Sequence, residues 1–141
     1  MNNSNIYVIA EIGNNHQGSV KHGLELIKAA KDAGANAVKT QKRDNKSLYT
    51  KNFFNQIYDN PNSFGSSYGE HREKLELNKN DYKELIDYAK ELKIDFFATP
   101  FDLKSLEFLE QFNLASYKIA SADITNIYLQ AEIAKTKKEI F

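Results

Sequence analysis

The fold is decided by the stretch IYVIAEIGNNHQGSVKHGLELIKAAKDAGANAVKTQ, residues 6–41. Residues 6–10 form a nearly continuous apolar run, which suits a strand that is buried on both faces. Ser19 can cap a helix in which apolar residues recur at helical spacing, and Gly34 ends that helix. A second short run, residues 37–41, follows directly. This strand–helix–strand unit predicts two parallel strands joined by a right-handed crossover.

Strand and helix patterns alternate strictly through the rest of the chain, and no G-x-G-x-x-G motif follows the first strand. Such alternation favours a barrel over a dinucleotide-binding sheet. We therefore predict an α/β fold in one domain, residues 1–141. It would be the N-terminal portion of a (β/α)8 TIM barrel, with about four βα units and no closure. A doubly wound, flavodoxin-like sheet is the alternative. The remaining predicted elements are helix 81–93, strand 95–99, a helix capped by Asp102, strand 116–120, a helix opened by Thr125, and an approach to an unformed fifth strand at 137–141.

Composition excludes several classes of function. Lys plus Arg equals Asp plus Glu at 19 each, so the chain has no global field that would attract nucleic acid or an anionic membrane. The sequence has no cysteine, which excludes disulfides, thiolate nucleophiles and cysteine metal sites and fits a reducing compartment. The N-terminal apolar run is too short for a signal peptide or a membrane span. These features predict a soluble, cytoplasmic protein.

The long segment from Lys42 to Asn78 shows no steady periodicity, and a connection of this length inside a compact domain is usually functional or disordered. It carries too many aromatic residues for a solvated linker, so we expect an ordered flap that packs on the domain. Those aromatic residues are Tyr49, Phe53, Phe54, Tyr58, Phe64 and Tyr68.

The predicted strands end in polar residues, at the end of a barrel where active sites lie. Lys39 and Gln41 are two residues apart, so their side chains should point to the same side of their strand. The same would hold for Ser121 and Asp123 if the fourth strand continued in its direction. The full set of polar strand-end residues is Glu11, Lys39, Gln41, Thr99, Lys118, Ser121 and Asp123.

A lysine inside a barrel strand is costly to bury without a partner. Lys39 and Lys118 could pair with Glu11 and Asp123 in a structural charge network. Alternatively, the two lysines and nearby hydroxyl groups could bind a small anion such as a phosphorylated carboxylate. A Schiff-base lysine is a third possibility.

The three histidines, His16, His22 and His71, have no spacing that makes a metal site by themselves. His16 lies in a segment with the composition of a turn, where a lone histidine is usually a hydrogen-bonding surface residue. We therefore predict no metal ligand in this chain.

Four ordered motifs together carry a family resemblance that covers the chain after Asn5. They are AEIGNNHQG (10–18), VKTQ (38–41), ATPF (98–101) and YKIASAD (117–123). In order and spacing they resemble the sialic acid synthase family, whose members condense phosphoenolpyruvate with an N-acetylhexosamine. YGEH (68–71) resembles the vertebrate-type members.

The resemblance implies a site and a cofactor. It places the phosphoenolpyruvate site on Lys39, Gln41, Thr99, Lys118 and Ser121. It places Glu11 and Asp123 as catalytic groups that face the sugar and the reacting carbons. It also implies a divalent metal, usually Mn²⁺, held by histidines on later strands, a C-terminal antifreeze-like domain beyond this chain, and a homodimer at full length.

The sequence therefore predicts a fragment of a nonulosonic acid synthase that joins phosphoenolpyruvate to N-acetylmannosamine, giving N-acetylneuraminate, and that is inactive as this chain alone. Its substrates would be small molecules, with no nucleic acid or membrane partner. Alternatives are a legionaminate- or pseudaminate-type synthase, a non-catalytic half-barrel that associates with itself through the exposed edges of its first and fourth strands, and a Schiff-base aldolase.

Overall fold

The computed structural model describes residues 6–141, which form one parallel sheet with strand order β1-β2-β3-β4-β5. A flavodoxin-like sheet would place β1 between β2 and β3. The sequential order excludes that alternative and is the order of strands around a barrel wall. The strands are β1 (Ile9–Gly13), β2 (Ala37–Lys42), β3 (Asp95–Pro100), β4 (Ser116–Tyr117) and β5 (Glu139–Ile140).

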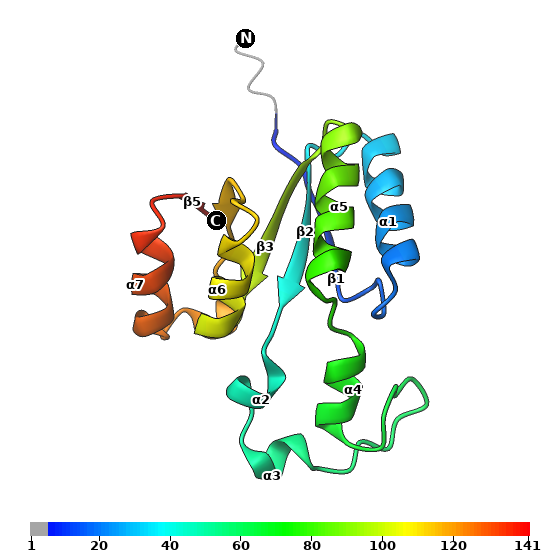
Figure 1. The fold of residues 1–141 in the computed structure, drawn as a ribbon, viewed down its shortest axis with the longest axis vertical. Coiled ribbons are helices and arrows are strands. Elements are labelled where there is room, and N and C mark those ends of the chain that lie inside the picture. Colours follow the sequence, from blue (N-terminus) through cyan, green and yellow to red (C-terminus); the bar gives the residue numbers. More distant parts are fainter. Residues whose placement is uncertain (1–5) are drawn as a thin grey trace.

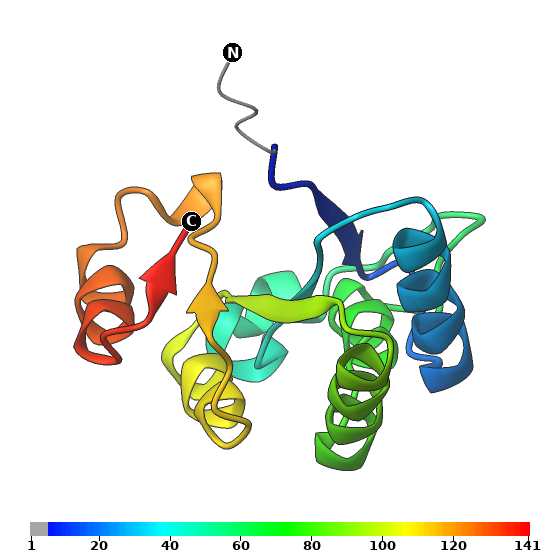
Figure 2. The ribbon, with the colours of Figure 1, turned by 90° about the horizontal axis from the view of Figure 1, so that it is seen from above.

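Four helices cover the convex side of the sheet, and the concave side carries none (Figure 2). Their apolar faces and the sheet form a single core, as the predicted alternation requires. The helices are α1 (Val20–Asp32), α5 (Lys79–Glu91), α6 (Leu103–Glu110) and α7 (Ile127–Lys135). The buried core includes Ile27, Val38, Leu85, Ala98, Leu109, Tyr117, Leu129 and Ile133.

The helices begin where the sequence supplies a side-chain acceptor for free backbone N–H groups. The Ser19 hydroxyl accepts from His22 N, and the Asp102 carboxylate accepts from Ser105 N, as predicted. Asn78 and Asp81 form a reciprocal capping box, which starts α5 at Lys79, earlier than the predicted residue 81.

The strand boundaries differ from the prediction, most of all in the first and last strands. β1 runs from Ile9 to Gly13 and not over residues 6–10, so Glu11 lies within the strand, and residues 6–8 are exposed where a buried strand was predicted. β4 stops at Tyr117 because the chain turns into a 3-10 helix, η1 (Ser121–Asp123), shortly afterwards. A fifth strand does form, and its two residues pair with β4. The unpaired edges are therefore those of β1 and β5, and the expectation that β4 is an edge is wrong.

Residues 43–78, which we call the flap, lie beyond the carboxyl ends of β2 and β3 (Figure 1). They contain three short helices, α2 (Asn45–Leu48), α3 (Lys51–Phe54) and α4 (Tyr68–Lys74). Tyr68 packs with its ring centroid 5.3 Å from that of Tyr49 and 4.7 Å from that of Phe53. The ordered flap is confirmed, and its aromatic residues serve mainly its own packing.

No helix within residues 6–141 combines the length and the apolar character needed to cross a membrane.

Candidate active site

Lys39 is the centre of the first part of the candidate site. It lies on the concave side of β2, is 8% exposed, and its Nζ donates to Thr99 Oγ1 at 3.1 Å. Its ammonium group also forms an ion pair with Glu11, the residue directly across from it in β1. The structure thus brings together three predicted site residues from three strands, and the partners offset the cost of burying the lysine.

Gln41 and Glu11 converge on Gly13. A Cβ atom at Gly13 would lie 2.8 Å from Glu11 Oε1 and 3.1 Å from Gln41 Nε2, so a larger residue there would require the ends of these two side chains to shift. The backbone of Gln41 is fixed from the other side, because the buried Tyr82 donates its hydroxyl to the Gln41 carbonyl at 2.9 Å. We did not predict a role for Gly13 from the sequence, although Gly13 lies only two residues after the predicted site residue Glu11.

Lys118 begins the second part of the site, at the end of β4. Its backbone N–H donates to Ala98 O at 3.1 Å, which places it beside the residue that precedes Thr99. Its Nζ donates to Ile119 O at 2.6 Å, and within residues 6–141 no carboxylate lies within ion-pairing distance of it. The charge network considered for Lys118 and Asp123 therefore does not form, and among residues 6–141 the Ile119 carbonyl is the only hydrogen-bond partner of the Lys118 ammonium group.

Asp123 and Ser121 do not point to one side as a strand would require, because η1 ends the extended backbone. Ser121 is exposed. Asp123 Oδ1 accepts from Asn126 Nδ2 at 3.4 Å, while Oδ2 is buried and has no partner among the described residues. A buried carboxylate oxygen without a donor is available to accept a hydrogen bond from a ligand.

His16 is buried, at 2% exposure, so the prediction of a surface histidine is wrong. Its Nδ1 accepts from the backbone N–H of Gly18 at 3.1 Å, which fixes the turn that follows β1. Burial lowers the pKa of His16, and the positive charge of Lys42 lowers it further. A single loop histidine carries no periodic signal, so its burial could not be inferred from sequence.

The lowered pKa of His16 predicts acid sensitivity. The unfolded chain binds this proton more readily than the folded chain, so the stabilisation is present above the ordinary histidine pKa of about 6.5. It is lost as the pH falls through the lowered folded pKa, with a slope of at most about 1.4 kcal/mol per pH unit for one proton. The free energy of unfolding, measured in urea between pH 7.5 and 5, should fall less steeply with decreasing pH in His16→Gln than in the wild type.

Part of the pH dependence of the free energy of unfolding should persist in His16→Gln, because the pKa of His71 is also lowered. Burial is the larger cause of that lowering, and the charge of Arg72 is the smaller one. His22, which is exposed on α1, gives the matched control. Equal slopes for His16→Gln and His22→Gln would contradict this assignment.

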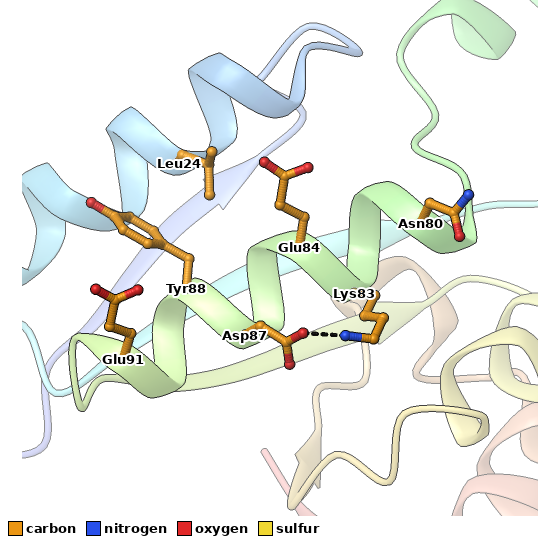
Figure 3. Close-up of a pocket in the computed structure, with 7 residues that line it drawn as sticks. All are labelled: Leu24, Asn80, Lys83, Glu84, Asp87, Tyr88 and Glu91. Atoms are coloured by element: carbon orange, nitrogen blue, oxygen red, sulfur yellow. Dashed lines mark hydrogen bonds and ion pairs between the residues drawn. The ribbon is translucent and has the colours of Figure 1, made fainter.

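The hollow shown in Figure 3 does not coincide with these residues. It lies between α1 and α5 in the outer helical layer, has a volume of about 440 Å³, and is lined by Leu24, Tyr88 and several charged residues of α5. None of its lining residues is a predicted site residue. The strand ends, which gather the buried lysine and its partners, are the better candidate for chemistry.

A metal does not fit the side chains of residues 6–141 alone. No three histidine, aspartate or glutamate side chains in that range gather closely enough to hold an ion.

Comparisons with known proteins agree with the fold and with the motifs. A family model described as the NeuB family matches residues 26–141. The chain is 42% identical over 129 residues to N-acetylneuraminate-9-phosphate synthase of Drosophila melanogaster, a match covering 92% of this chain and 35% of that protein. It is 37% identical to N,N'-diacetyllegionaminic acid synthase of Campylobacter jejuni, covering 94% of this chain and 40% of that protein.

Among solved structures, the fold matches N-acetylneuraminic acid (sialic acid) synthetase from Leptospira borgpetersenii in complex with citrate. The TM-score is 0.78 at 31% identity, and the match covers 96% of this chain and 43% of that one. The chain thus spans between a third and a half of the length of these relatives, and the predicted partial barrel is confirmed. Because the family model covers most of the sequence, the chain belongs to the NeuB family.

Proposed function

We propose that the catalytic unit containing this chain is a nonulosonic acid synthase that joins phosphoenolpyruvate to an N-acetylhexosamine, with N-acetylmannosamine as the acceptor. The observation that carries the proposal is the buried Lys39, held between Glu11 and Thr99 at the carboxyl ends of neighbouring strands. Legionaminate- and pseudaminate-type acceptors are the alternatives within the same chemistry, because relatives with those names also match the chain.

The lysines suit the charges of phosphoenolpyruvate, which carries a phosphate and a carboxylate. Charge-assisted hydrogen bonds to such groups are stronger than neutral ones. Lys118, which has no carboxylate partner in the described chain, is free to bind one anionic group. Lys39 would bind the other by exchanging Glu11 for the ligand, with Thr99 and Gln41 as neighbouring donors, and Ser121 would complete the set.

Glu11 and Asp123 would then act on the acceptor. The side chain of Glu11 is 48% exposed, so its carboxylate can turn from Lys39 toward the sugar. Asp123 Oδ2 would accept from a sugar hydroxyl or from the attacking water. In the proposed reaction, C3 of phosphoenolpyruvate attacks the aldehyde carbon of the open-chain sugar, water adds at C2, and phosphate leaves.

The divalent metal implied by the family resemblance, with Mn²⁺ expected, would need ligands outside residues 6–141, since these residues do not supply a ligand set. The roles given above to the side chains of this chain do not depend on it.

A Schiff-base aldolase is disfavoured at Lys39, because the amine of a Schiff-base lysine must be free to attack a carbonyl. Lys39 Nζ instead donates to Thr99 and pairs with Glu11. Borohydride trapping with pyruvate should therefore give no adduct mass at Lys39.

Calorimetric titration tests the proposal on the chain itself. We expect saturable binding of phosphoenolpyruvate, without phosphate release when N-acetylmannosamine and Mn²⁺ are added. The catalytic unit that includes these residues should release phosphate under the same conditions. Absence of phosphoenolpyruvate binding to the chain, together with absence of turnover by the larger unit, would refute the proposed function.

A further inference from the structure

The loop that follows β1 holds backbone conformations that most residues avoid. Gly13, Gln17 and Gly18 have φ angles of +35°, +53° and +73°, all in the left-handed region. Glycine adopts this region freely, but Gln17 carries a Cβ and is strained there. Strained residues persist only where the surrounding structure holds them, and they cluster at functional sites. The side chain that holds this loop is therefore of interest for the candidate site.

His16 holds the loop from inside. Its Nδ1 accepts from the backbone N–H of Gly18 at 3.1 Å, two residues further along the chain. Burial and then the charge of Lys42 lower the pKa of His16, and a hydrogen bond with the Gly13 backbone opposes both effects. The buried imidazole therefore contacts the loop at both of its glycines.

The pairing of β1 with β2 is irregular where this loop begins. Glu11 pairs with Lys39 and Gly13 pairs with Thr40, so β1 advances by two residues where β2 advances by one. An extra residue of this kind, as in a β-bulge, bends its strand and is common beside active sites, where it changes the direction of a side chain. The irregularity places the backbone of Gly13 inside the candidate site.

Two predicted site side chains lie against Gly13. The close approach of Glu11 Oε1 and Gln41 Nε2 to the position of a Gly13 Cβ, 2.8 and 3.1 Å, shows that both side-chain ends pack on this residue. Any displacement of Gly13 would therefore change where the Glu11 carboxylate and the Gln41 amide can lie. Such small displacements matter, because binding groups must be held within about 0.5 Å of their productive positions.

We propose that His16 is a positioning residue for phosphoenolpyruvate binding, which acts through Gly13 on the side-chain amide of Gln41. The imidazole keeps the strained loop closed, and the closed loop keeps Gly13 in place beneath the amide. The inference rests on the proposed synthase function for the identity of the ligand. The positioning of the Gln41 amide can be measured without any ligand.

Two substitutions of His16 differ in one contact. Asparagine carries its side-chain oxygen as many bonds from the backbone as His16 Nδ1, and it commonly accepts from the N–H group two residues further on. His16→Asn should therefore keep the hydrogen bond to Gly18. Glutamine carries its oxygen one bond farther out, so His16→Gln should lose that hydrogen bond while it remains polar. All measurements are made at pH 7.5, above the ordinary histidine pKa of about 6.5, so that wild-type His16 is neutral.

NMR signals of the side-chain amides in the 141-residue chain report the positioning directly. We expect the Gln41 amide signals to shift or broaden in His16→Gln and to stay near their wild-type positions in His16→Asn. The backbone of Gln41 is held separately, because the Tyr82 hydroxyl donates to its carbonyl at 2.9 Å. Gln130, whose Nε2 donates to the Asp123 carbonyl at 2.9 Å, is the internal control and should not shift.

Calorimetric titration with phosphoenolpyruvate gives the functional measurement. His16→Gln should weaken binding by about ten-fold, because a donor to a charged ligand would be displaced, and His16→Asn should stay within about two-fold of the wild type. In a Gln41→Ala background, His16→Gln should change the affinity by less than about two-fold, since the amide that His16 positions is then absent. His22→Gln, at an exposed position on α1, should leave the affinity unchanged.

Urea unfolding of each variant checks that the fold is retained. If His16→Gln does not unfold cooperatively, the same substitution is made together with Gln17→Gly. Glycine relieves the strain at φ +53° and should recover stability without restoring the hydrogen bond to Gly18. The double variant then takes the place of His16→Gln in both measurements.

Three results would overturn the inference: unchanged Gln41 amide signals in His16→Gln, an equal loss of phosphoenolpyruvate affinity in the Gln41→Ala background, or equal effects of His16→Gln and His16→Asn. A loss of stability without either change would make His16 a structural residue only. If the Gln41 signals shift as expected but the wild-type chain does not bind phosphoenolpyruvate, the positioning by His16 stands and the proposed function fails.

Discussion

Replacing Lys39 with methionine is expected to weaken phosphoenolpyruvate binding by about ten- to a hundred-fold, because a hydrogen bond to a charged group contributes about 1.5–3 kcal/mol. Methionine retains much of the buried stem, so the core of β2 should stay packed. Glu11 would lose its partner, but its side chain is 48% exposed and can be solvated. Calorimetric titration of the variant with phosphoenolpyruvate measures the effect.

Lys21→Met is the matched control, because the Lys21 side chain is exposed on α1, in the outer helical layer, and is not one of the proposed site residues. It should bind phosphoenolpyruvate as the wild type does. If Lys39→Met retained wild-type affinity, the pairing of Lys39 with Glu11 would be a structural charge network, and the anion site would have to lie elsewhere. Lys118→Met should also weaken binding, since Lys118 has no carboxylate partner to lose in the described chain.

Replacing Gly18 with alanine is expected to destabilise the chain by about 2–5 kcal/mol. Gly18 has φ +73, a conformation that costs a residue with a Cβ about 1–2 kcal/mol. Its added Cβ would also lie 2.1 Å from the carbonyl oxygen of Lys74, so α4 would have to move away from the turn after β1. Such overpacking typically costs about 1–3 kcal/mol. The free energy of unfolding in urea gives the measurement.

Gly34→Ala separates the two contributions. Gly34 has φ +85, but a Cβ at this position would meet no atom within 4 Å. The free energy of unfolding of Gly34→Ala should therefore fall only by the conformational cost of a Cβ at positive φ, about 1–2 kcal/mol. Similar losses in the two variants would mean that the turn after β1 and the flap are not held in close contact.

The alternation of elements could be read from sequence because each βα unit carries its own local signals. Caps such as Ser19 and Asp102 satisfy backbone donors within one turn, and buried strands need continuous apolar runs. The neighbouring positions of Glu11, Lys39 and Thr99 followed from the parallel register, since carboxyl ends of parallel strands meet at one edge. The catalytic and substrate-binding roles of the site residues stay predictions.

Features that depend on distant segments could not be predicted. β4 ends at Tyr117 although Lys118, Ile119 and Ala120 have a strand-like pattern, because η1 redirects the chain. This redirection also separates Lys118 from Asp123. The contact between the base of α4 and the end of β2, which brings Arg72 near Arg43, joins positions about thirty residues apart and leaves no periodic trace in the sequence.

The unequal lengths of the strand pairings divide the candidate site into two regions of different local stability. β2 and β3 pair over six residues, whereas β4 pairs with β5 over two, next to an open edge. Local opening costs least where few backbone hydrogen bonds must break. Amide hydrogens around Lys39 should therefore exchange with solvent far more slowly than those around Lys118 and Asp123. A ligand that binds both lysines would hold the region around Lys118 and Asp123 in a fixed position relative to the region around Lys39. The entropy lost in this ordering would reduce the observed free energy of binding.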